Sequence, residues 1–289
     1  MPQIQVIPDF FEDNSLSILR LDLPDPVSGG NKIYKLKYNL EEMGRLGLKK
    51  LLTFGGAFSN HIAAVATAGR ERNFETVGII RGDELTEISN AVLDYASSCG
   101  MKLIFISRED YRKRNDPVFQ KNLLVQYGPA YLLPEGGSNE FAVKGCKEIL
   151  SAETEKYDQL ICPVGTGATL AGIISSAKKH QEIIGLAVLN GKDYLEKEVE
   201  NYLAKETVVA KWKIEHDFTL GGYGKSNPEL KNFIAEMKTR YELPLDEIYS
   251  GKTLFAIRQM KKNDFLRGKN HLFVHTGGYA FTADARFPA

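Results

Sequence analysis

Residues 159–172 of the chain read QLICPVGTGATLAG. The first six residues are apolar, as in a short buried strand, and a glycine-rich stretch then leads into residues of helical type. A second stretch of this kind, LLTFGGAFSNHIAAVATAGRE, covers residues 51–71. A strand that passes through a glycine turn into a helix is typical of α/β proteins with a mainly parallel sheet.

The same alternation continues along the chain. The strand-like runs are LLTF (51–54), ETVGII (75–80), KLIFI (102–106), QLICPV (159–164), IIGLAV (183–188) and HLFVH (271–275). Between them lie segments of helical period, such as NAVLDYASSCG (90–100) and NPELKNFIAEMKTRY (227–241). The pattern predicts an α/β fold, and no Pro/Ser-rich linker marks a boundary between domains.

Composition excludes several classes of protein. The 289 residues carry 37 basic and 37 acidic side chains, so the balance of charge gives no reason to expect nucleic acid or an anionic membrane as a partner. The first ten residues, MPQIQVIPDF, lack the features of a signal peptide, and no apolar run is long enough to cross a bilayer. Cys99, Cys146 and Cys162 are too few and too far apart for a disulfide framework or a zinc site. We therefore expect a soluble cytoplasmic protein without a metal.

Glycine-rich segments follow three of the predicted strands, at the ends where ligands of α/β sheets bind. In GGAFSNH (55–61), Ser59 and Asn60 are good N-cap residues. This segment can be an ordinary capped helix, or its helix N-terminus can bind a carboxylate.

The segment GTGATLAG (165–172) can be a phosphate cradle or only a tight turn between strand and helix. It is neither a Walker A loop nor a complete G-x-G-x-x-G motif. The third segment, TGG, covers residues 276–278.

A fourth glycine-rich segment, GGNKIYKLKYNL, covers residues 29–40 and holds Lys32, Lys35 and Lys37. Taken alone, the segment favours solvated lysines at the start of a helix.

Together, and in their order along the chain, these segments resemble the 1-aminocyclopropane-1-carboxylate deaminase / D-cysteine desulfhydrase family of pyridoxal-phosphate enzymes. The resemblance runs from Gly29 to Gly278 and also includes GGYGKS (221–226) and IYSGKT (248–253). It implies the tryptophan synthase β-like fold (PLP fold type II), with two open, mostly parallel α/β domains. The larger, cofactor-binding domain would comprise residues 1–38 and 142–289, and the smaller domain, 39–141, would close over the substrate. A homodimer is also implied.

The resemblance implies that Lys32 holds pyridoxal 5'-phosphate as a Schiff base and moves the substrate's α-proton, while Lys35 and Lys37 are solvated or structural. Burial would keep the Lys32 amine partly neutral, which both tasks require. The expected catalytic residues are Lys32, Ser59, Tyr223 and Tyr249. The expected cofactor-binding residues are Lys32, Asn60, Gly165, Thr166, Gly167, Ala168, Thr169, Ser250, Thr276 and Gly277. Ser59, Asn60 and His61 are expected to bind the carboxylate of a small amino-acid substrate.

The residue after Tyr249 separates two reactions within the family. It is expected to face the pyridine nitrogen, where the cyclopropane deaminases have a glutamate and this chain has Ser250. A neutral hydroxyl cannot act as the charge partner of a protonated ring, so it favours expulsion of a good leaving group such as thiolate. We therefore predict β-elimination of the D-cysteine desulfhydrase type, giving pyruvate, ammonia and sulfide, and His61 agrees with this branch. The alternative is 1-aminocyclopropane-1-carboxylate deaminase activity, with ring opening to 2-oxobutyrate and ammonia.

Three positions depart from the family's motifs. Phe58 replaces a glutamine, Tyr34 replaces an arginine, and Ala168 replaces a glycine or serine. The first two make the site more apolar and leave the substrate open. A non-catalytic protein that binds an amino acid or a phosphorylated metabolite is an alternative of another class, and Lys32 argues against it. A Rossmann-type nucleotide binder is the weakest reading, because the acidic residue expected at a ribose is missing.

Overall fold

The structure, a computed structural model, describes residues 2–11, 15–23, 29–188, 194–218, 225–260 and 270–278. The chain divides into two compact units, which are Met1–Tyr34 with Val143–Ala289 (unit 1) and Lys35–Ala142 (unit 2). The chain leaves unit 1 within helix α1 (Asn31–Arg45) and returns within helix α6 (Glu140–Cys146).

Unit 1 contains a six-stranded sheet with the strand order β1-β2-β10-β7-β8-β9. The strands are β1 (Gln3–Ile7), β2 (Leu16–Arg20), β7 (Gln159–Val164), β8 (Glu182–Ala187), β9 (Lys211–Glu215) and β10 (His271–His275). Only β1 runs antiparallel to its neighbour, and every other pair in the sheet is parallel. The carboxyl ends of β7 and β10 therefore lie on the same edge of the sheet, which places the turns after these two strands close together.

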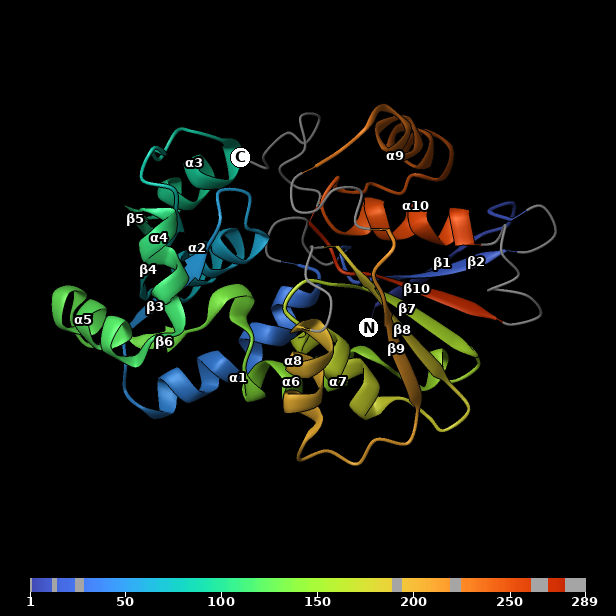
Figure 1. Ribbon diagram of the computed structural model, residues 1–289, viewed down its shortest axis with the longest axis horizontal. Coiled ribbons are helices and arrows are strands. Elements are labelled where there is room, and N and C mark those ends of the chain that lie inside the picture. Colours follow the sequence, from blue (N-terminus) through green and yellow to red (C-terminus); the bar gives the residue numbers. More distant parts are fainter. Residues whose placement is uncertain are drawn as a thin grey trace. The chain divides into compact units, whose positions relative to one another are not determined.

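Helices cover both faces of this sheet (Figure 1). Helices α9 (Pro228–Tyr241) and α10 (Ser250–Met260) lie on one face, and α6, α7 (Ala168–Ser176) and α8 (Tyr194–Leu203) lie on the other. Two short 3-10 helices, η3 (Lys147–Ile149) and η4 (Ala152–Thr154), lie between α6 and β7. A parallel sheet covered on both faces needs apolar strands, and β7 and β10 are buried along their whole length.

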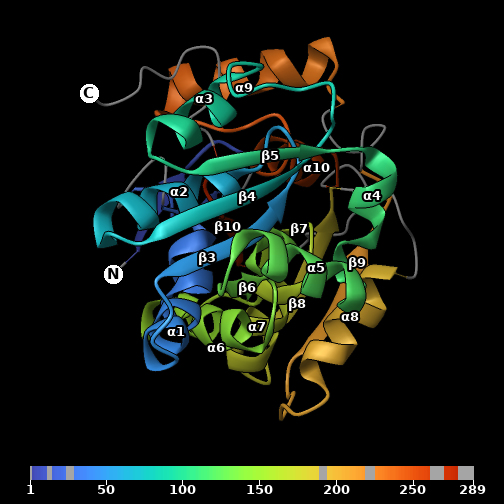
Figure 2. The same cartoon turned by 90° about the vertical axis from the view of Figure 1, so that its left-hand side faces the viewer.

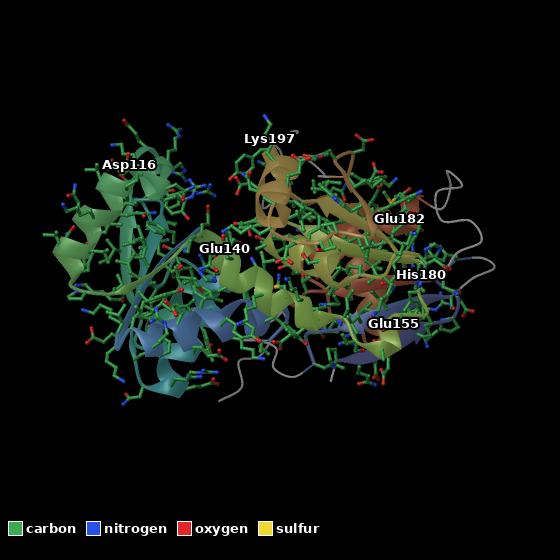
Figure 3. All side chains as sticks on the ribbon, turned by 90° about the horizontal axis from the view of Figure 1, so that it is seen from below. Asp116, Glu140, Glu155, His180, Glu182 and Lys197 are labelled. Carbon is green, nitrogen blue, oxygen red and sulfur yellow. The ribbon has the colours of Figure 1, made fainter. Side chains whose placement is uncertain are left out.

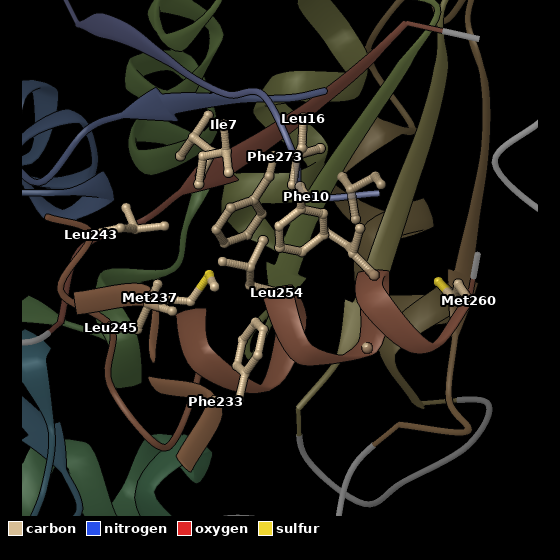
Figure 4. Close-up of a cluster of buried hydrophobic side chains, with 14 of the residues drawn as sticks. Ile7, Phe10, Leu16, Phe233, Met237, Leu243, Leu245, Leu254, Met260 and Phe273 are labelled. Carbon is tan, nitrogen blue, oxygen red and sulfur yellow. The ribbon is translucent and has the colours of Figure 1, made fainter. Parts of the chain in front are cut away.

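The main core of unit 1 lies between the sheet and the helices α9 and α10 (Figure 4). Phe273 from β10, Leu254 from α10 and Phe233 from α9 meet there, and Ile7 and Leu16 close the cluster on the side of β1 and β2. This packing holds α10, and with it the turn that precedes α10, against the sheet.

Unit 2 has a four-stranded, fully parallel sheet with the order β5-β4-β3-β6 (Figure 2). Its strands are β3 (Lys50–Gly55), β4 (Glu75–Arg81), β5 (Lys102–Ile106) and β6 (Tyr131–Leu133). Its helices are α2 (Asn60–Arg72), α3 (Ala91–Ser98), α4 (Arg108–Arg112) and α5 (Pro117–Tyr127), with 3-10 turns η1 (Lys113–Asn115) and η2 (Glu135–Gly137). Leu52, Phe54 and Ile79 pack with Tyr111 of α4 and Leu123 of α5 on one face of the sheet.

Two glycines let the helices on one face of the unit 1 sheet approach closely. A Cβ at Gly145 of α6 would collide with the carbonyl oxygen of Tyr34 in α1, and a Cβ at Gly172 of α7 would collide with Cys146 of α6. Because only glycine permits these contacts, the first turns of α1 and α7 are held in fixed positions through α6.

The predicted strands are confirmed. KLIFI, QLICPV and HLFVH coincide with β5, β7 and β10, and the other three runs match β3, β4 and β8 within one residue. Residues 90–100 and 227–241 contain α3 and α9, whose N-caps are Asn90 and Asn227. Strands β1, β2, β6 and β9 were not predicted.

Charged side chains point outward from both units, as Asp116, Glu155 and Lys197 illustrate (Figure 3). Within the described ranges, no helix carries an apolar stretch long enough to span a membrane.

A buried ion pair follows β2, on the side of the sheet where β10 also ends. Arg20 donates two hydrogen bonds to the Asp22 carboxylate, with N–O distances of 2.8 and 2.6 Å, and both side chains are buried. Burial alone would raise the pKa of Asp22, but the hydrogen bonds from Arg20, the nearby His275 ring and the charge of Arg20 together outweigh it, so the pKa of Asp22 lies below its usual value.

We expect Asp22→Ala to lower the free energy of unfolding at pH 7 by about 3–5 kcal/mol, because Arg20 would be left buried without its carboxylate. The matched control is Asp9→Ala, which removes an exposed carboxylate 3.3 Å from Arg240 and should change stability by less than about 1 kcal/mol. Urea unfolding monitored by circular dichroism measures both.

The pH dependence of the same pair has a defined sign. A carboxyl whose folded pKa is lowered contributes its stability above its unfolded pKa, near 3.8, and loses it as the pH falls through the folded pKa. The stability difference between wild type and Asp22→Ala should therefore shrink below pH 4. A difference that stays constant from pH 7 to pH 3 would contradict this account of the pair.

Candidate functional site

Two glycine turns of unit 1 meet at the start of α1. Gly30 and Gly277 both have positive φ, +70° and +84°, which favours glycine. The backbone N–H of Asn31 donates to the carbonyl oxygen of Thr276 at 3.1 Å, and a Cβ at Gly30 would collide with that oxygen. This close approach places the predicted lysine, Lys32, beside the predicted cofactor-binding residues Thr276 and Gly277.

His275 fixes the turn that contains Thr276 and Gly277. Its Nε2 donates to the Pro244 carbonyl at 2.8 Å, and its Nδ1 accepts from the Gly277 N–H at 3.1 Å. A carbonyl can only accept and an amide N–H can only donate, so the ring is neutral with its proton on Nε2. The buried imidazole thus connects this turn to the segment that leads into α10.

The turn between β7 and α7 has the properties of an anion site. Gly167, with φ +81°, is the N-cap residue of α7, so this helix N-terminus has no side-chain cap. Other helix N-termini are capped by side chains, namely those of Ser59 (α2), Asn90 (α3), Asp116 (α5) and Asn227 (α9). Ala168 and Thr169 begin α7 and are buried. Backbone N–H groups of a buried, uncapped helix start fit a phosphate group.

Asn31 joins this turn to Lys32. Lys32 Nζ donates to Asn31 Oδ1 at 2.7 Å, and Asn31 Nδ2 donates to the hydroxyl of Thr169 at 2.9 Å. Asn31 was not predicted as a site residue, although it stands in the GGNK segment. Its function as a connector depends on Thr169, 138 residues later in the chain.

The structure distinguishes the lysines of the GGNKIYKLKYNL segment. Lys35 is buried and donates to the Gly136 carbonyl and the Ser138 hydroxyl, both at 2.8 Å, so it is structural. Lys37 is exposed, with its Nζ 5.0 Å from the centre of the Tyr38 ring. Lys32 is half-buried and lies at the glycine turns.

Another lysine, Lys252 in α10, is 1% exposed. Burial lowers the pKa of Lys252, while the negative charge of Asp246 acts in the opposite direction. A buried amine of this kind is an alternative point of attachment for an aldehyde cofactor, so Lys32 and Lys252 need to be distinguished by experiment.

Tyr249 and Ser250 lie on a turn organised by Asp246. The Asp246 carboxylate accepts from the N–H groups of Ile248, Tyr249 and Ser250, at 2.7, 2.5 and 2.9 Å, and from the Ser250 hydroxyl at 2.5 Å. These four donors use the acceptor positions of a carboxylate. The sequence analysis missed Asp246, which looks like an ordinary turn residue until its partners are known.

Tyr249 lies against the glycine turn after β7, since a Cβ at Gly165 would be 3.3 Å from its ring. Ser250 is fully buried, and its hydroxyl is hydrogen-bonded to Asp246. Its contact with the pyridine nitrogen stays a prediction. Unit 1 therefore brings together Lys32, Tyr249, Thr276, Gly277 and the 165–169 turn. Tyr223 lies outside the described residues.

Unit 2 carries the predicted carboxylate-binding residues. Ser59 is the N-cap of α2, and its hydroxyl oxygen accepts from the Ile62 N–H at 3.4 Å. Ser59 and Asn60 are half-buried, at the start of a helix whose N–H groups favour an anion. A Cβ at Gly55 would collide with Ile62, so this glycine is needed for packing between β3 and α2.

The side chain of His61 points into unit 2. It is 2% exposed, and its Nε2 lies 2.7 Å from the hydroxyl of Thr53, which itself donates to the Leu133 carbonyl at 2.8 Å. Because Thr53 has only one proton, Nε2 of His61 must be the donor to Thr53. We infer that His61 serves the α2 N-terminus through its backbone and its packing.

Two of the departures from the family's motifs have different environments. Phe58 precedes the N-cap of α2 and is 50% exposed, unusually high for a large apolar side chain. Tyr34 is half-buried in α1, and burial, with smaller contributions from Cys146 and Glu148, raises the pKa of its phenol.

The chain resembles several known proteins over most of its length. It is 31% identical to a Thermotoga maritima protein named "Putative 1-aminocyclopropane-1-carboxylate deaminase", with 91% of this chain and 88% of the relative covered. It is 26% identical to the bifunctional D-cysteine desulfhydrase/1-aminocyclopropane-1-carboxylate deaminase of Arabidopsis thaliana, with 94% of this chain and 74% of the relative covered.

Among solved structures, the chain is similar to one described as an ACC deaminase homologue. The TM-score is 0.81 at 25% identity, with 97% of this chain and 90% of the other covered. This similarity and the two mostly parallel sheets confirm the predicted α/β fold class. Residues 17–277 match the family model described as pyridoxal-phosphate dependent enzyme. The chain therefore belongs to the family of pyridoxal-phosphate-dependent enzymes, whose members use pyridoxal 5'-phosphate as their cofactor.

Proposed function

We propose that this enzyme catalyses β-elimination from a small amino acid with a good leaving group at Cβ, as in a D-cysteine desulfhydrase. With cysteine, one molecule of water is consumed and the products are pyruvate, ammonia and hydrogen sulfide. The observation that carries the proposal is Ser250, a hydroxyl residue at the position after Tyr249. The proposal builds on membership of a pyridoxal-phosphate-dependent family.

Unit 1 is proposed to hold the cofactor. The N–H groups of residues 165–169 would bind its phosphate, and Lys32 would bind its aldehyde carbon covalently. When bound, pyridoxal 5'-phosphate supplies an electron sink next to the substrate's α-carbon. Lys32, once displaced by the substrate's amino group, would take the proton from that α-carbon. Tyr249, against Gly165, is the proposed proton carrier for the leaving group.

Unit 2 is proposed to hold the substrate's carboxylate. The N-terminus of α2, with Ser59 at its cap and Asn60 in its first turn, offers N–H donors of the kind that bind a carboxylate. Asn60 is further proposed to hydrogen-bond the ring oxygen of the cofactor, as the family resemblance implies. Homodimer formation and a cytoplasmic location remain expectations from the sequence.

The arrangement around Ser250 supports elimination over ring opening. Its hydroxyl donates to the Asp246 carboxylate and accepts from the Asp246 N–H at 3.0 Å, and it carries no charge to balance a protonated ring. The negative charge of Asp246 is itself stabilised by three backbone N–H groups at the start of α10. A weaker electron sink suits thiolate, which leaves more readily than the carbon expelled from a cyclopropane.

A second candidate is 1-aminocyclopropane-1-carboxylate deamination. It is favoured by the names of the relatives, one of which is called bifunctional for both reactions. In that reaction the cyclopropane ring opens and, with water, 2-oxobutyrate and ammonia form.

A substrate panel distinguishes the two functions. We expect sulfide and pyruvate from D- or L-cysteine, pyruvate from β-chloroalanine, and little 2-oxobutyrate from 1-aminocyclopropane-1-carboxylate. Sulfide is measured colorimetrically, and the two oxo acids are separated chromatographically. The enzyme without cofactor is the control for spontaneous loss of sulfide. Efficient ring opening with no sulfide from either cysteine isomer would overturn the proposed reaction.

We expect borohydride reduction of the cofactor-loaded protein to fix the cofactor on Lys32. Peptide mapping by mass spectrometry should find the added mass on the Lys32 peptide in the wild type and on no peptide in Lys32→Ala. Lys35→Ala and Lys252→Ala serve as controls for two buried lysines and should still carry the label on Lys32. A label on the Lys252 peptide of the wild-type protein would refute this assignment.

Gly165→Ala should weaken cofactor binding about ten- to a hundredfold, the effect of one lost hydrogen bond to a charged group. Gly165 has no positive φ, and an added Cβ would meet only the Tyr249 ring, at 3.3 Å, so folding should be little affected. Gly167 is less suitable, because its positive φ and its approach to Val199 make any substitution strained.

Cofactor titration followed by absorbance measures the affinity, and thermal unfolding of the cofactor-free protein tests the fold. The matched control is Gly44→Ala in α1, where an added Cβ meets nothing within 4 Å. Wild-type affinity in Gly165→Ala would count against the proposed phosphate turn.

A further inference from the structure

We propose that Asn31 is a positioning residue that connects the Lys32 amine to the phosphate end of the cofactor through one directional chain of hydrogen bonds. The inference rests on Lys32 as the cofactor lysine in the proposed function, but it is independent of the substrate. The chain runs from Lys32 Nζ to the Asn31 amide and from there to the hydroxyl of Thr169, which stands in the first turn of α7.

The chemistry of the groups sets the direction of this chain. A lysine side chain in its charged form can only donate, so the oxygen of the Asn31 amide must face Nζ, at 2.7 Å. The amide nitrogen must then face Thr169, whose hydroxyl oxygen accepts at 2.9 Å. The thiol of Cys146, 3.8 Å away, also points toward this oxygen as a donor.

The hydroxyl of Thr169 therefore accepts on the side of Asn31 and Cys146, and its own proton remains for another acceptor. An anion bound at the uncapped N-terminus of α7 is such an acceptor. A phosphate oxygen there would complete a chain in which every group donates toward the phosphate, and hydrogen bonds in such chains strengthen one another.

Asn31 is well suited to this role because its backbone is also held. Its N–H donates to the Thr276 carbonyl at 3.1 Å, and the residue is buried. Three hydrogen bonds in different directions leave the amide little freedom. The Lys32 amine is thereby kept in one place when it is not bonded to the cofactor, which is when it must act on a proton.

The neutrality of the amide is part of the proposal. A carboxylate at this position could still accept from Nζ, but its charge would hold the Lys32 amine in the protonated form to higher pH. A protonated amine can neither bond to an aldehyde nor accept a proton. Asparagine supplies the acceptor without the charge.

The first test uses Asn31→Asp and the cofactor-free protein. The rate of covalent capture of pyridoxal 5'-phosphate, followed by absorbance and confirmed by borohydride mapping to Lys32, is measured from pH 6 to pH 10. We expect the pH midpoint of capture to rise by about one to three units. The matched control is Asn232→Asp, which introduces the same charge at an exposed position of α9 and should leave the midpoint unchanged.

The second test separates positioning of Lys32 from binding of the phosphate. Thr169→Val removes the hydroxyl, whereas Thr169→Ser keeps it. Capture is measured with pyridoxal, which has no phosphate, and with pyridoxal 5'-phosphate. Relative to Thr169→Ser, we expect Thr169→Val to capture pyridoxal about two- to tenfold more slowly, the effect of one hydrogen bond, and to show a larger loss with the phosphorylated form.

The outcomes are distinct. Equal pyridoxal capture by the two Thr169 variants, or an unchanged pH midpoint in Asn31→Asp, would overturn the positioning role of Asn31. If the wild type still carried the label on Lys32, the proposed function would stand. Absence of the label from Lys32 in the wild type would instead refute the lysine assigned under the proposed function, and this inference with it. If Asn31→Asp fails to fold by circular dichroism, the Thr169 pair with pyridoxal still decides the question.

Discussion

The candidate site of unit 1 depends on one steric constraint, the contact of two backbone turns at Gly30 and Gly277. Any side chain at Gly30 would collide with the carbonyl oxygen of Thr276 and separate the start of α1 from the end of β10. The hydrogen bond from Asn31 to that oxygen requires this contact, and the bond from Gly277 to His275 fixes the turn on its other side. The start of α1, which carries Lys32, is therefore positioned by backbone packing, which varies less than a long side chain does.

The same region contains a helix start without a side-chain cap. Elsewhere this chain caps helices with Asn or Asp side chains, as at α3, α5 and α9. At α7 it places Gly167 instead, and the buried start of that helix has no side-chain cap. An arrangement that forgoes about 1 kcal/mol of capping energy is expected where an anion completes the helix end.

Sequence reasoning located the elements with strong local signals. Strands buried on both faces, such as β7 and β10, are nearly continuous apolar runs and were predicted. In β9, at the sheet edge, charged residues alternate with apolar ones, and β6 has only three residues, so neither strand was predicted. Lys32 could be predicted as the cofactor lysine because its motif is local. Asn31, His275 and Asp246 were missed because their functions are defined by partners rather than by residue type, and a sequence gives no orientation for a side-chain amide or an imidazole.

The turn at Asp246 holds the position on which the proposed reaction depends. Ser250 stands where cyclopropane deaminases have glutamate, which by itself reads as a simple exchange of a carboxylate for a hydroxyl. In this chain, however, the Ser250 hydroxyl is buried and bound to a carboxylate that also holds the backbone of Tyr249. A glutamate at position 250 would have to displace the neighbours of a fully buried residue and would place a second negative charge against Asp246. The residue proposed to face the pyridine nitrogen and the residue that shapes the Tyr249 turn are therefore coupled, so a substitution at position 250 would also disturb that turn.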